Sequence, residues 1–405
     1  MVPNGWENGD LSRYISIKHG FAFKSQFFSD SGDLVVLTPG SFYETGGFRD
    51  QGAKTKYYEG EVPDGYLLSK GDMLLAMTEQ AEGLLGSALF VPEDDKYLHN
   101  QRLGLVQVDD SDKVCLEFLY LFFNAKSSRK QITEQSTGTK VRHTSPDRLR
   151  SVIGLIPPLE EQCQIAKILA TWDKAIATTE CLIANSQQQK KGLMQQLLTG
   201  KKRFAGYKGQ WSYKAISEIS TRIQRKSDGD EHPILTISSL SGFVTQADKY
   251  SRYMAGESVK NYILLKKGEF AYNKGNSKTY QFGCVFDLEG FEIGLVPHVY
   301  VCFKLNEGLS HRYFKYLFEA DYLKPQLGAL VNTGVRNNGL LNIKPAEFMN
   351  TKVPVPCFDE QERIADVLHA ASKELKALKS KLEHLKQEKQ ALMQQLLTGK
   401  RRVTV

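Results

Sequence analysis

The sequence predicts an α+β fold with an internal pseudo-twofold repeat, in which two similar α/β regions are separated by a pair of long helices. The first observation is the segment LMQQLLTGK, which occurs at Leu193–Lys201 and again at Leu392–Lys400. The second is a sustained seven-residue spacing of apolar residues before each copy, which is typical of a coiled coil. The third is a series of short apolar runs between turn residues, which indicates β-strands ahead of each helix.

The duplication extends beyond the identical segment at the same offset of 199 residues. Gln162 matches Gln361, and both follow a proline and an acidic residue. In the globular parts the match is weaker, with Trp211 standing where Trp6 stands. We infer a duplication in which the helices stayed alike while the globular regions diverged, which indicates one shared role for the helices and two different roles for the regions.

Each long helix carries signals for both of its ends. Acidic first turns stabilise the positive end of a helix dipole, and Gly200 and Gly399 are placed as helix stops. The first helix should run from about Leu159 to Leu198, roughly 60 Å at 1.5 Å per residue. We expect the two helices to pair antiparallel within the chain, although two separate surface helices remain an alternative. The seam residues are Ile165, Leu169, Trp172, Ile176, Ile183, Leu193, Leu197, Ile364, Leu368, Leu375, Leu378, Leu382, Leu385, Leu392 and Leu396.

The predicted boundaries place the globular regions at 1–157 and 204–355, and the coiled-coil helices at 158–203 and 356–405. Each globular region should contain short strands, then a helix, a glycine-containing loop and a final strand. The predicted helices and loops are Leu116–Gln135, Ser136–Pro146, Ser310–Leu323 and Asn332–Leu340. The predicted strands are Leu34–Leu37, Tyr66–Leu68, Met73–Met77, Ala88–Val91, Leu103–Val108, Val152–Ile156, Ile234–Ile237, Tyr262–Leu265, Phe270–Tyr272, Cys284–Phe286, Val299–Leu305 and Lys352–Val355.

Composition favours a cytoplasmic protein that no membrane segment anchors. No apolar window of membrane-spanning length occurs, and the start of the chain lacks the features of a signal peptide. The six cysteines form no C-x-x-C pair, so we expect free thiols, with no disulfide framework and no metal site. The net charge of +7 permits nucleic-acid binding without proving it. Basic runs follow each helix-stop glycine, and we interpret them as solvated helix ends rather than DNA contacts.

The search for catalytic motifs returns none. The sequence lacks a phosphate-binding G-x-x-x-x-G-K-[ST], a dinucleotide-binding G-x-G-x-x-G between strand and helix, H-E-x-x-H and G-x-S-x-G. It also lacks the Asn/Asp-Pro-Pro-Tyr/Phe motif with which amino-methyltransferases hold the target base. These absences favour a binding protein that holds no cofactor of its own.

Two glycine-containing loops and two nearby segments are the candidate contact surface for DNA, with solvated turns as the alternative. Arg and Lys can reach guanine, Asn can pair with the adenine edge, and glycine lets the backbone approach a phosphate. The candidates are Thr137, Gly138, Lys140, Arg142, His143, Lys54 and Lys56 in the first half, and Thr333, Gly334, Arg336, Asn337, Asn338, Lys274, Asn276 and Lys278 in the second.

These features resemble the specificity subunits of type I restriction-modification systems. The resemblance rests on P-x-x-E-Q at Pro158–Gln162, where Pro157 matches Pro356 of the second copy. It rests as well on the heptad helix and on LMQQLLTGK with its basic tail, both of which recur in the second half. It also rests on K-G-D/E at Lys70–Asp72 and Lys267–Glu269, and on the glycine loop. The second copy departs slightly, since Cys357-Phe358 stands where the first has Pro158-Leu159.

The resemblance implies a DNA-recognition subunit without catalytic activity. Each globular region would be a target-recognition domain that reads half of a bipartite site in double-stranded DNA. The helix pair would set the spacing of the half-sites and dock two methyltransferase subunits, with restriction and translocase subunits as further partners. AdoMet, Mg and ATP would belong to those partners. A coiled-coil scaffold without sequence-specific DNA binding, or a free-standing enzyme, would be the alternatives.

Overall fold

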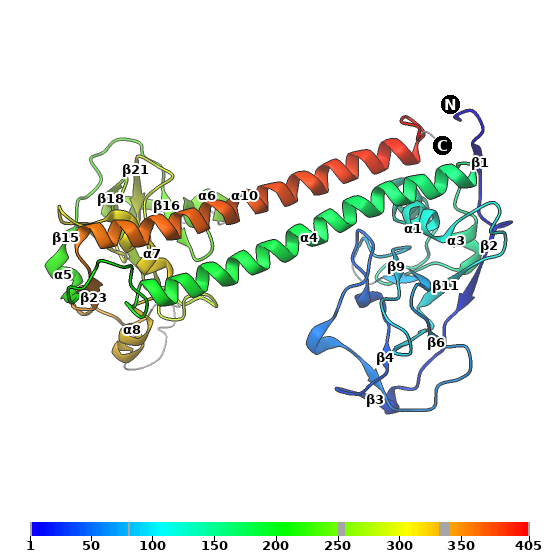
Figure 1. Ribbon diagram of the computed structural model, residues 1–405, viewed down its shortest axis with the longest axis horizontal. Helices are drawn as coiled ribbons and strands as arrows, with labels where there is room; N and C mark the ends of the chain where they lie inside the picture. Colours follow the sequence, from blue (N-terminus) through cyan, green and yellow to red (C-terminus); the bar gives the residue numbers. More distant parts are fainter. Residues whose placement is uncertain (1, 80–81, 250–255, 332–340, 404–405) are drawn as a thin grey trace. The chain divides into compact units, whose positions relative to one another are not determined.

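The computed structural model describes residues 2–79, 82–249, 256–331 and 341–403. The chain divides into two compact units, of which unit 1 comprises Met1–Thr179 and Lys381–Val405 and unit 2 comprises Glu180–Ser380. Each unit contains one globular region, the beginning of one long helix and the end of the other (Figure 1). This division cuts both long helices, whereas the predicted boundaries follow the helix ends, and those boundaries stay a prediction.

The two long helices are α4 (Leu159–Leu197) and α10 (Phe358–Leu397). Each has two acidic residues in its first turn, where they interact favourably with the helix dipole. Each is followed by a glycine in the left-handed region, with φ of +70° at Gly200 and +64° at Gly399. Glycine adopts this conformation without steric cost, which is why the sequence ends both helices there. The first helix therefore ends one residue before the predicted Leu198.

Within each unit, the beginning of one long helix packs against the end of the other, so the two segments are antiparallel. In unit 1, Ile165 and Leu169 share a core cluster with Leu396. In unit 2, Leu197 shares a cluster with Leu368. Every predicted seam residue is buried or half-buried, and full burial of one leucine contributes roughly 1.5–3 kcal/mol.

The globular region of unit 1 is built on a four-stranded antiparallel sheet in the order β2-β11-β7-β9. Helix α1 contributes Phe118, Phe122 and Phe123 to the core beside this sheet. The other sheets are β3-β5-β4-β10-β6, β1-β13 and β8-β12. The elements are β1 (Glu7–Gly9), β2 (Ile15–His19), β3 (Phe28–Ser29), β4 (Val35–Val36), β5 (Tyr57–Tyr58), β6 (Leu67–Leu68), β7 (Met73–Ala76), β8 (Thr78–Glu79), β9 (Ala88–Phe90), β10 (Tyr97–Leu98), β11 (Leu103–Val108), α1 (Leu116–Asn124), α2 (Lys126–Glu134), β12 (Arg142–His143), α3 (Pro146–Arg150) and β13 (Gly154–Ile156).

The globular region of unit 2 repeats this plan with the sheet order β15-β22-β19-β20. Helix α7 supplies Phe314 and Phe318 to its core, and the other described sheets are β14-β23, β16-β17 and β18-β21. The elements are β14 (Ser212–Ala215), α5 (Ile216–Ile219), β15 (Ser220–Ile223), β16 (Leu235–Ser238), β17 (Gly242–Thr245), α6 (Gln246–Lys249), β18 (Ile263–Lys266), β19 (Phe270–Asn273), β20 (Cys284–Asp287), β21 (Ile293–Val296), β22 (Val301–Leu305), α7 (His311–Glu319), α8 (Lys324–Leu330), α9 (Pro345–Met349) and β23 (Lys352–Val355).

The helices that follow the main sheets differ from the prediction. The single helix expected over 116–135 is wrong, because Ala125 is extended (φ −68°, ψ 141°) and separates α1 from α2. In unit 2, the helix expected to reach Leu323 ends at Glu319. Pro325 then lies in the first turn of α8, where its missing N–H costs no helical hydrogen bond.

Candidate nucleic-acid interface

The predicted first loop is partly a hairpin rather than an open loop. Thr137 and His143 exchange backbone hydrogen bonds of 3.0 and 2.8 Å, and β12 pairs with β8. Gly138 has φ of +99°, and a Cβ there would lie 2.1 Å from a carbonyl oxygen across the turn. Of the predicted contact residues, Thr137, Gly138, Lys140 and His143 are exposed and Arg142 is half-buried. The hairpin therefore presents polar and basic side chains from a fixed backbone.

A buried carboxylate, Glu79, holds the segment beside this hairpin. Its Oε2 accepts hydrogen bonds from three successive backbone N–H groups, those of residues 83–85, at 3.1, 2.9 and 2.8 Å. Its Oε1 lies 3.9 Å from Nη1 of Arg142. Arg129 donates to the Gly83 carbonyl, and burial lowers the pKa of this guanidinium to about 10. Sequence reasoning missed Glu79 and Arg129, because no motif links them and only the fold brings them together.

Lys54 and Lys56 belong to another part of unit 1. Lys54 ends a 3-10 turn (Gly52–Lys54), and Lys56 precedes β5 in the five-stranded sheet. The Lys56 carbonyl accepts a hydrogen bond from the Val36 N–H at 2.8 Å, which fixes its backbone to β4. Both lysines are exposed. Their sheet is distinct from the one that carries the hairpin, so their assignment to the same contact surface stays a prediction.

The second predicted loop lies outside the described residues, as do its candidates Thr333, Gly334, Arg336, Asn337 and Asn338. The residue that follows the loop is described: the Leu341 N–H donates to the Lys274 carbonyl at 3.0 Å. In unit 1 the Thr144 N–H makes the corresponding bond to the Met77 carbonyl at 2.9 Å. Leu341 lies 197 residues after Thr144, and Lys274 lies 197 residues after Met77. The two loops therefore return to equivalent strands.

The segment after β19 carries the other second-half candidates. Asn276 and Lys278 are exposed, and Lys274 is half-buried. Asn273 accepts a hydrogen bond from the Gly275 N–H at 3.0 Å, and the Tyr280 N–H donates to Ser277 Oγ at 3.0 Å. These local bonds shape a turn that presents Asn276 and Lys278 beside the return of the second loop.

At the start of α4, Trp6, Glu161 and Arg402 form a cluster that joins the beginning of the chain to its end. Trp6 Nε1 donates to Glu161 Oε2 at 3.1 Å, and Arg402 Nε donates to the same oxygen at 3.0 Å. The guanidinium lies 5.4 Å from the centre of the indole ring. Hydrogen bonds from Arg402 and Trp6 lower the pKa of Glu161.

Unit 2 contains the same arrangement at the start of α10. Trp211 Nε1 donates to Glu360 Oε2 at 2.9 Å, and Arg203 makes two hydrogen bonds to that carboxylate at 2.9 and 2.7 Å. Arg203 and Arg402 of the basic runs therefore form ion pairs within the protein, and Arg203 is half-buried. Lys201, Lys400 and Arg402 are exposed, as expected for solvated helix ends.

The glutamine of the repeated Pro-acidic-Gln segment connects each long helix to its globular region. Gln162 Oε1 accepts the N–H of Cys115, the residue before α1, at 3.1 Å. Gln361 Oε1 accepts the N–H of Ser310, the residue before α7, at 2.9 Å. Each amide also donates at 2.8 Å to the carbonyl of the proline five residues earlier. The repeated sequence thus forms the same connection between long helix and globular region in both units.

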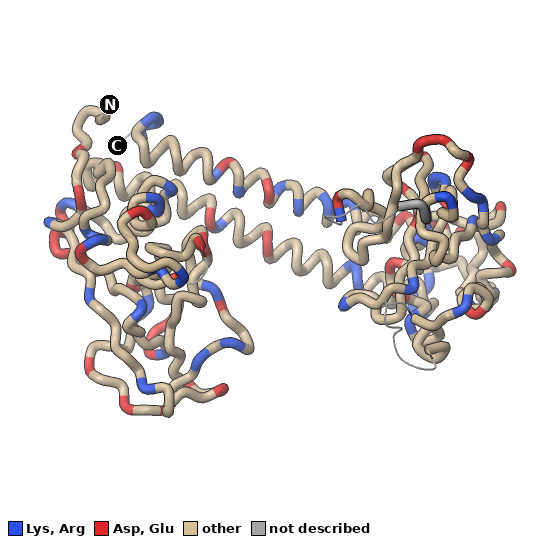
Figure 2. Tube along the Cα trace, turned by 180° about the vertical axis from the view of Figure 1, so that it is seen from behind, with Lys and Arg blue, Asp and Glu red and all other residues tan. Residues whose placement is uncertain are grey.

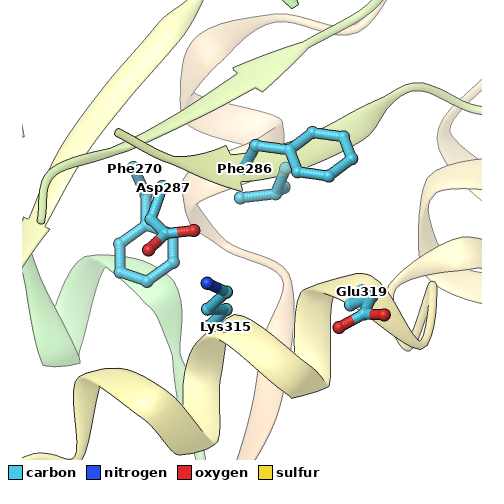
Figure 3. A pocket seen from close by; sticks show the side chains of 6 residues that line it. Phe270, Phe286, Asp287, Lys315 and Glu319 are labelled. Carbon is cyan, nitrogen blue, oxygen red and sulfur yellow. The ribbon is translucent and has the colours of Figure 1, made fainter. Parts of the chain in front are cut away.

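The cores of the two units differ where a small cavity lies beside α7. There Asp287 and Lys315 point toward one another (Figure 3), and burial raises the pKa of Asp287. His311 Nε2 is 3.4 Å from Asp287 Oδ2. At the matching places of unit 1, the last residue of β9 and the fifth of α1, Phe90 and Tyr120 stack with ring centres 5.0 Å apart. Similar frames therefore enclose different side chains.

Along the Cα trace of each unit, Lys and Arg are interspersed among Asp and Glu (Figure 2). Among the described residues, one group has metal-ligand atoms within reach of one another: Asp228, Asp230 and His232. Both aspartates are exposed, and His232 Nε2 already contacts Asp228 Oδ1 at 2.8 Å. The absence of a metal site stays a prediction.

Comparison with known proteins points to one family. Residues 3–188 match the family model of the type I restriction modification DNA specificity domain. The specificity subunit of the type I restriction enzyme MjaVIII from Methanocaldococcus jannaschii is 26% identical over 322 residues, which cover 74% of this chain and 73% of that subunit. The chain is similar to the specificity subunits of type I restriction-modification systems, and the family model itself covers its first half. The EcoBI specificity subunit of Escherichia coli is 27% identical over 199 residues, which cover 49% of this chain and 38% of that subunit.

Solved specificity subunits share the fold. The S subunit from M. genitalium aligns with a TM-score of 0.58 and 15% identity over 100% of this chain and 99% of its own. The HsdS subunit from Thermoanaerobacter tengcongensis aligns with a TM-score of 0.51 and 17% identity over 98% of both chains. The α+β class predicted from the repeat is thereby confirmed.

This similarity supports a role in DNA recognition. A specificity subunit is the DNA-recognition component of a type I restriction-modification complex and does not carry out the chemistry. None of the helices in the described ranges is long and apolar enough to cross a membrane.

Proposed function

We propose that unit 1 and unit 2 each read one half of a bipartite site in double-stranded DNA. The observation that supports this proposal is the repeated frame with unlike loops. The main sheets have the same order, and the two loops return to equivalent strands. The loop sequences differ, with TGTKVRH in the first half and NTGVRNN in the second. Different loops on equivalent frames would recognise different base sequences.

The proposed contacts use ordinary base-edge chemistry. Arg142 in the first half and Arg336 in the second can reach guanine O6 and N7, and Asn337 or Asn338 can pair with adenine. Gly138 lets the backbone of its turn approach a phosphate, which a Cβ would prevent. The remaining candidates would contribute phosphate contacts that position the domain.

The long helices are proposed to set the spacing between the half-sites. A 39-residue helix such as α4 is roughly 58 Å long at 1.5 Å per residue. Both helices contribute residues to unit 1 and to unit 2. In dimeric DNA readers the protein geometry fixes half-site spacing, and a duplicated chain can do so in the same way.

Two methyltransferase subunits are the proposed partners on the helix ends. Gln195 and Gln196 are exposed in one copy, and Gln394 and Gln395 are exposed in the other. Exposed residues that stay identical while buried cores diverge indicate two equal docking sites. We further propose restriction and translocase subunits as partners, with AdoMet, Mg and ATP bound by the partner subunits.

Charge substitutions test the docking surface. Gln195→Glu with Gln196→Glu should halve the amount of methyltransferase that co-purifies, because one of two sites is lost. The same pair of changes at Gln394 and Gln395 should remove the rest. Gln189→Glu is the matched control, since it is exposed and the other copy carries Glu388 there. Unchanged co-purification of the fourfold variant would refute the docking surface.

The recognition function is tested by methylation mapping. The chain would be co-expressed with its neighbouring methyltransferase gene, and modified adenines mapped across the host genome. A single motif of two short half-sites with a fixed gap is the expected result. A scaffold without sequence-specific binding would leave no such motif despite a stable complex.

A further inference from the structure

Two corresponding turns, one in each unit, expose a large apolar side chain. In unit 1, Tyr43 is 52% exposed, and in unit 2, Leu240 is 83% exposed. In unit 1, the turn lies inside the antiparallel bridge of Phe42 with Phe48. In unit 2, antiparallel pairing ends at Ser238 with Gly242, so Leu240 is the middle residue of a three-residue turn. The segments before the turns also correspond, since Val36 pairs parallel with Leu98, and Ile234 with Leu295.

In unit 1, this turn contacts residues that hold the segment beside the candidate hairpin. The Tyr43 carbonyl accepts a hydrogen bond from Ser87 Oγ at 2.7 Å, and the next carbonyl, that of Glu44, accepts from Arg129 at 3.4 Å. Arg129 also holds the Gly83 carbonyl within the segment that Glu79 organises. The turn with Tyr43 is therefore connected, through Arg129 and the segment that Glu79 organises, to the hairpin that presents Arg142 and His143.

In unit 2, the turn lies against Phe286, which contacts Tyr280 at the end of the segment that carries the second-half candidates. A Cβ on Gly242, at the end of the turn, would lie 3.3 Å from the ring of Phe286. That ring packs edge-on against Tyr280 at 5.9 Å, and the Tyr280 N–H binds Ser277 Oγ. The turn with Leu240 is thus linked through two aromatic rings to the loop of Asn276 and Lys278.

We propose that Tyr43 and Leu240 are specificity residues, each making an apolar contact with the methyl group of a thymine in its own half-site. This inference rests on the proposed bipartite recognition. An exposed apolar side chain beside basic and amide side chains matches the major groove, where the thymine methyl is the apolar group among polar base edges. A single exposed apolar residue is ordinary on a protein surface. The same exposure in corresponding turns of both units, each connected to a candidate contact surface, requires an explanation.

The first test maps methylation by complexes that contain Tyr43→Ala or Leu240→Ala. Each variant should relax the preference for thymine in one half-site by about tenfold and leave the other half-site unchanged. The matched controls are Ile153→Ala and Tyr213→Ala, which remove side chains that are 53% and 57% exposed outside the two turns. They should methylate like the unaltered complex.

The second test removes the methyl group from the DNA. Duplexes with the mapped site would carry deoxyuridine in place of each thymine in turn, and binding to the complex would be measured. The unaltered complex should lose about tenfold in affinity at one position per half-site, and the alanine variant should lose nothing further there. Insensitivity of the unaltered complex to deoxyuridine, a half-site without thymine, or equal losses at both half-sites would overturn the inference. If the unaltered complex methylates no two-part motif, the proposed function fails as well.

Discussion

At the scale of single residues, the duplication reproduces side-chain contacts as well as sequence. Glu161 and Glu360 each receive a tryptophan N–H and an arginine guanidinium. The sequence showed that the two tryptophans correspond and that both acids lie in first turns. It did not show that they meet, because each tryptophan is about 150 residues from its glutamate, at separations of 155 and 149.

The hydrogen bonds to Glu161 predict a pH dependence of stability. Its folded-state pKa lies below the usual 4.5, so its contribution is present at neutral pH and is lost as pH falls through the folded-state pKa. Glu161→Gln should therefore lower the free energy of unfolding at pH 7, and the difference should shrink as pH falls below 4.5 and vanish only below the folded-state pKa. Urea unfolding at a series of pH values measures this. A difference that stays constant with pH would contradict the ionic role.

Gln162 gives a second prediction at this scale. Gln162→Ala would leave the buried Pro157 carbonyl and the half-buried Cys115 N–H without this partner. The free energy of unfolding should fall by about 2 kcal/mol, the usual cost of unsatisfied buried polar groups. The control is Gln164→Ala, an exposed neighbour that should change stability by less than about 0.5 kcal/mol. Equal effects of the two substitutions in urea unfolding would contradict the role of Gln162 in connecting α4 to its globular region.

The candidate site was predictable only in part. Arg142 and His143 follow from the glycine loop and its basic residues, and the structure presents them from a hairpin. Glu79 and Arg129 did not follow, since a buried acid within a strand and a base within a helix carry no local pattern. The exposed Tyr43 and Leu240 were equally hidden, because side-chain exposure depends on the fold.

At the scale of elements, the long helices were the most predictable part. Their ends are local features, namely acidic first turns and terminal glycines, and their seam is a period that the sequence states directly. The break at Ala125 was missed because α1 and α2 both have helix-forming residues up to the junction. Short strands such as β2 depend on partners distant in sequence, which local patterns do not specify.

Glycine substitutions test how the helices end. Gly399→Ala should lower the thermal midpoint, because alanine in the left-handed region costs roughly 1 kcal/mol and its Cβ would lie 2.3 Å from Pro3. Gly200→Ala should cost less, since the nearest atom, on Trp211, is 3.3 Å away. Gly192→Ala, within α4 and free of neighbours within 4 Å, should stabilise by about 1 kcal/mol. Destabilisation by all three substitutions alike would contradict this account of the helix ends.

At the scale of the whole molecule, the chain is one structural plan used twice. Its end returns to its start, since Arg402 donates to the Asn4 carbonyl at 3.0 Å (Figure 1). Unit 1 thereby repeats the Trp-Glu-Arg cluster of unit 2. In unit 2 the arginine and the tryptophan of this cluster lie in the continuous chain after Gly200. Two copies of one partner would require two such equivalent clusters, one at the start of each long helix.

Salt dependence separates DNA recognition from a scaffold role. If the candidate lysines and arginines contact phosphates, the affinity of the complex for its mapped site should fall steeply between 50 and 200 mM salt, by about 10³-fold for six contacts. Lys140→Gln should make this dependence shallower by about one contact. Binding titrations at several salt concentrations measure the slope. A slope near zero would favour the scaffold.

The most direct test of the central claim exchanges one recognition domain. Residues 1–157 would be replaced by the corresponding domain of another specificity subunit, and methylated adenines mapped with the same methyltransferase partner. The account predicts a motif in which one half-site changes while the other half-site and the gap stay the same. A motif that changes in both halves, or in neither, would contradict the division of recognition between two independent units.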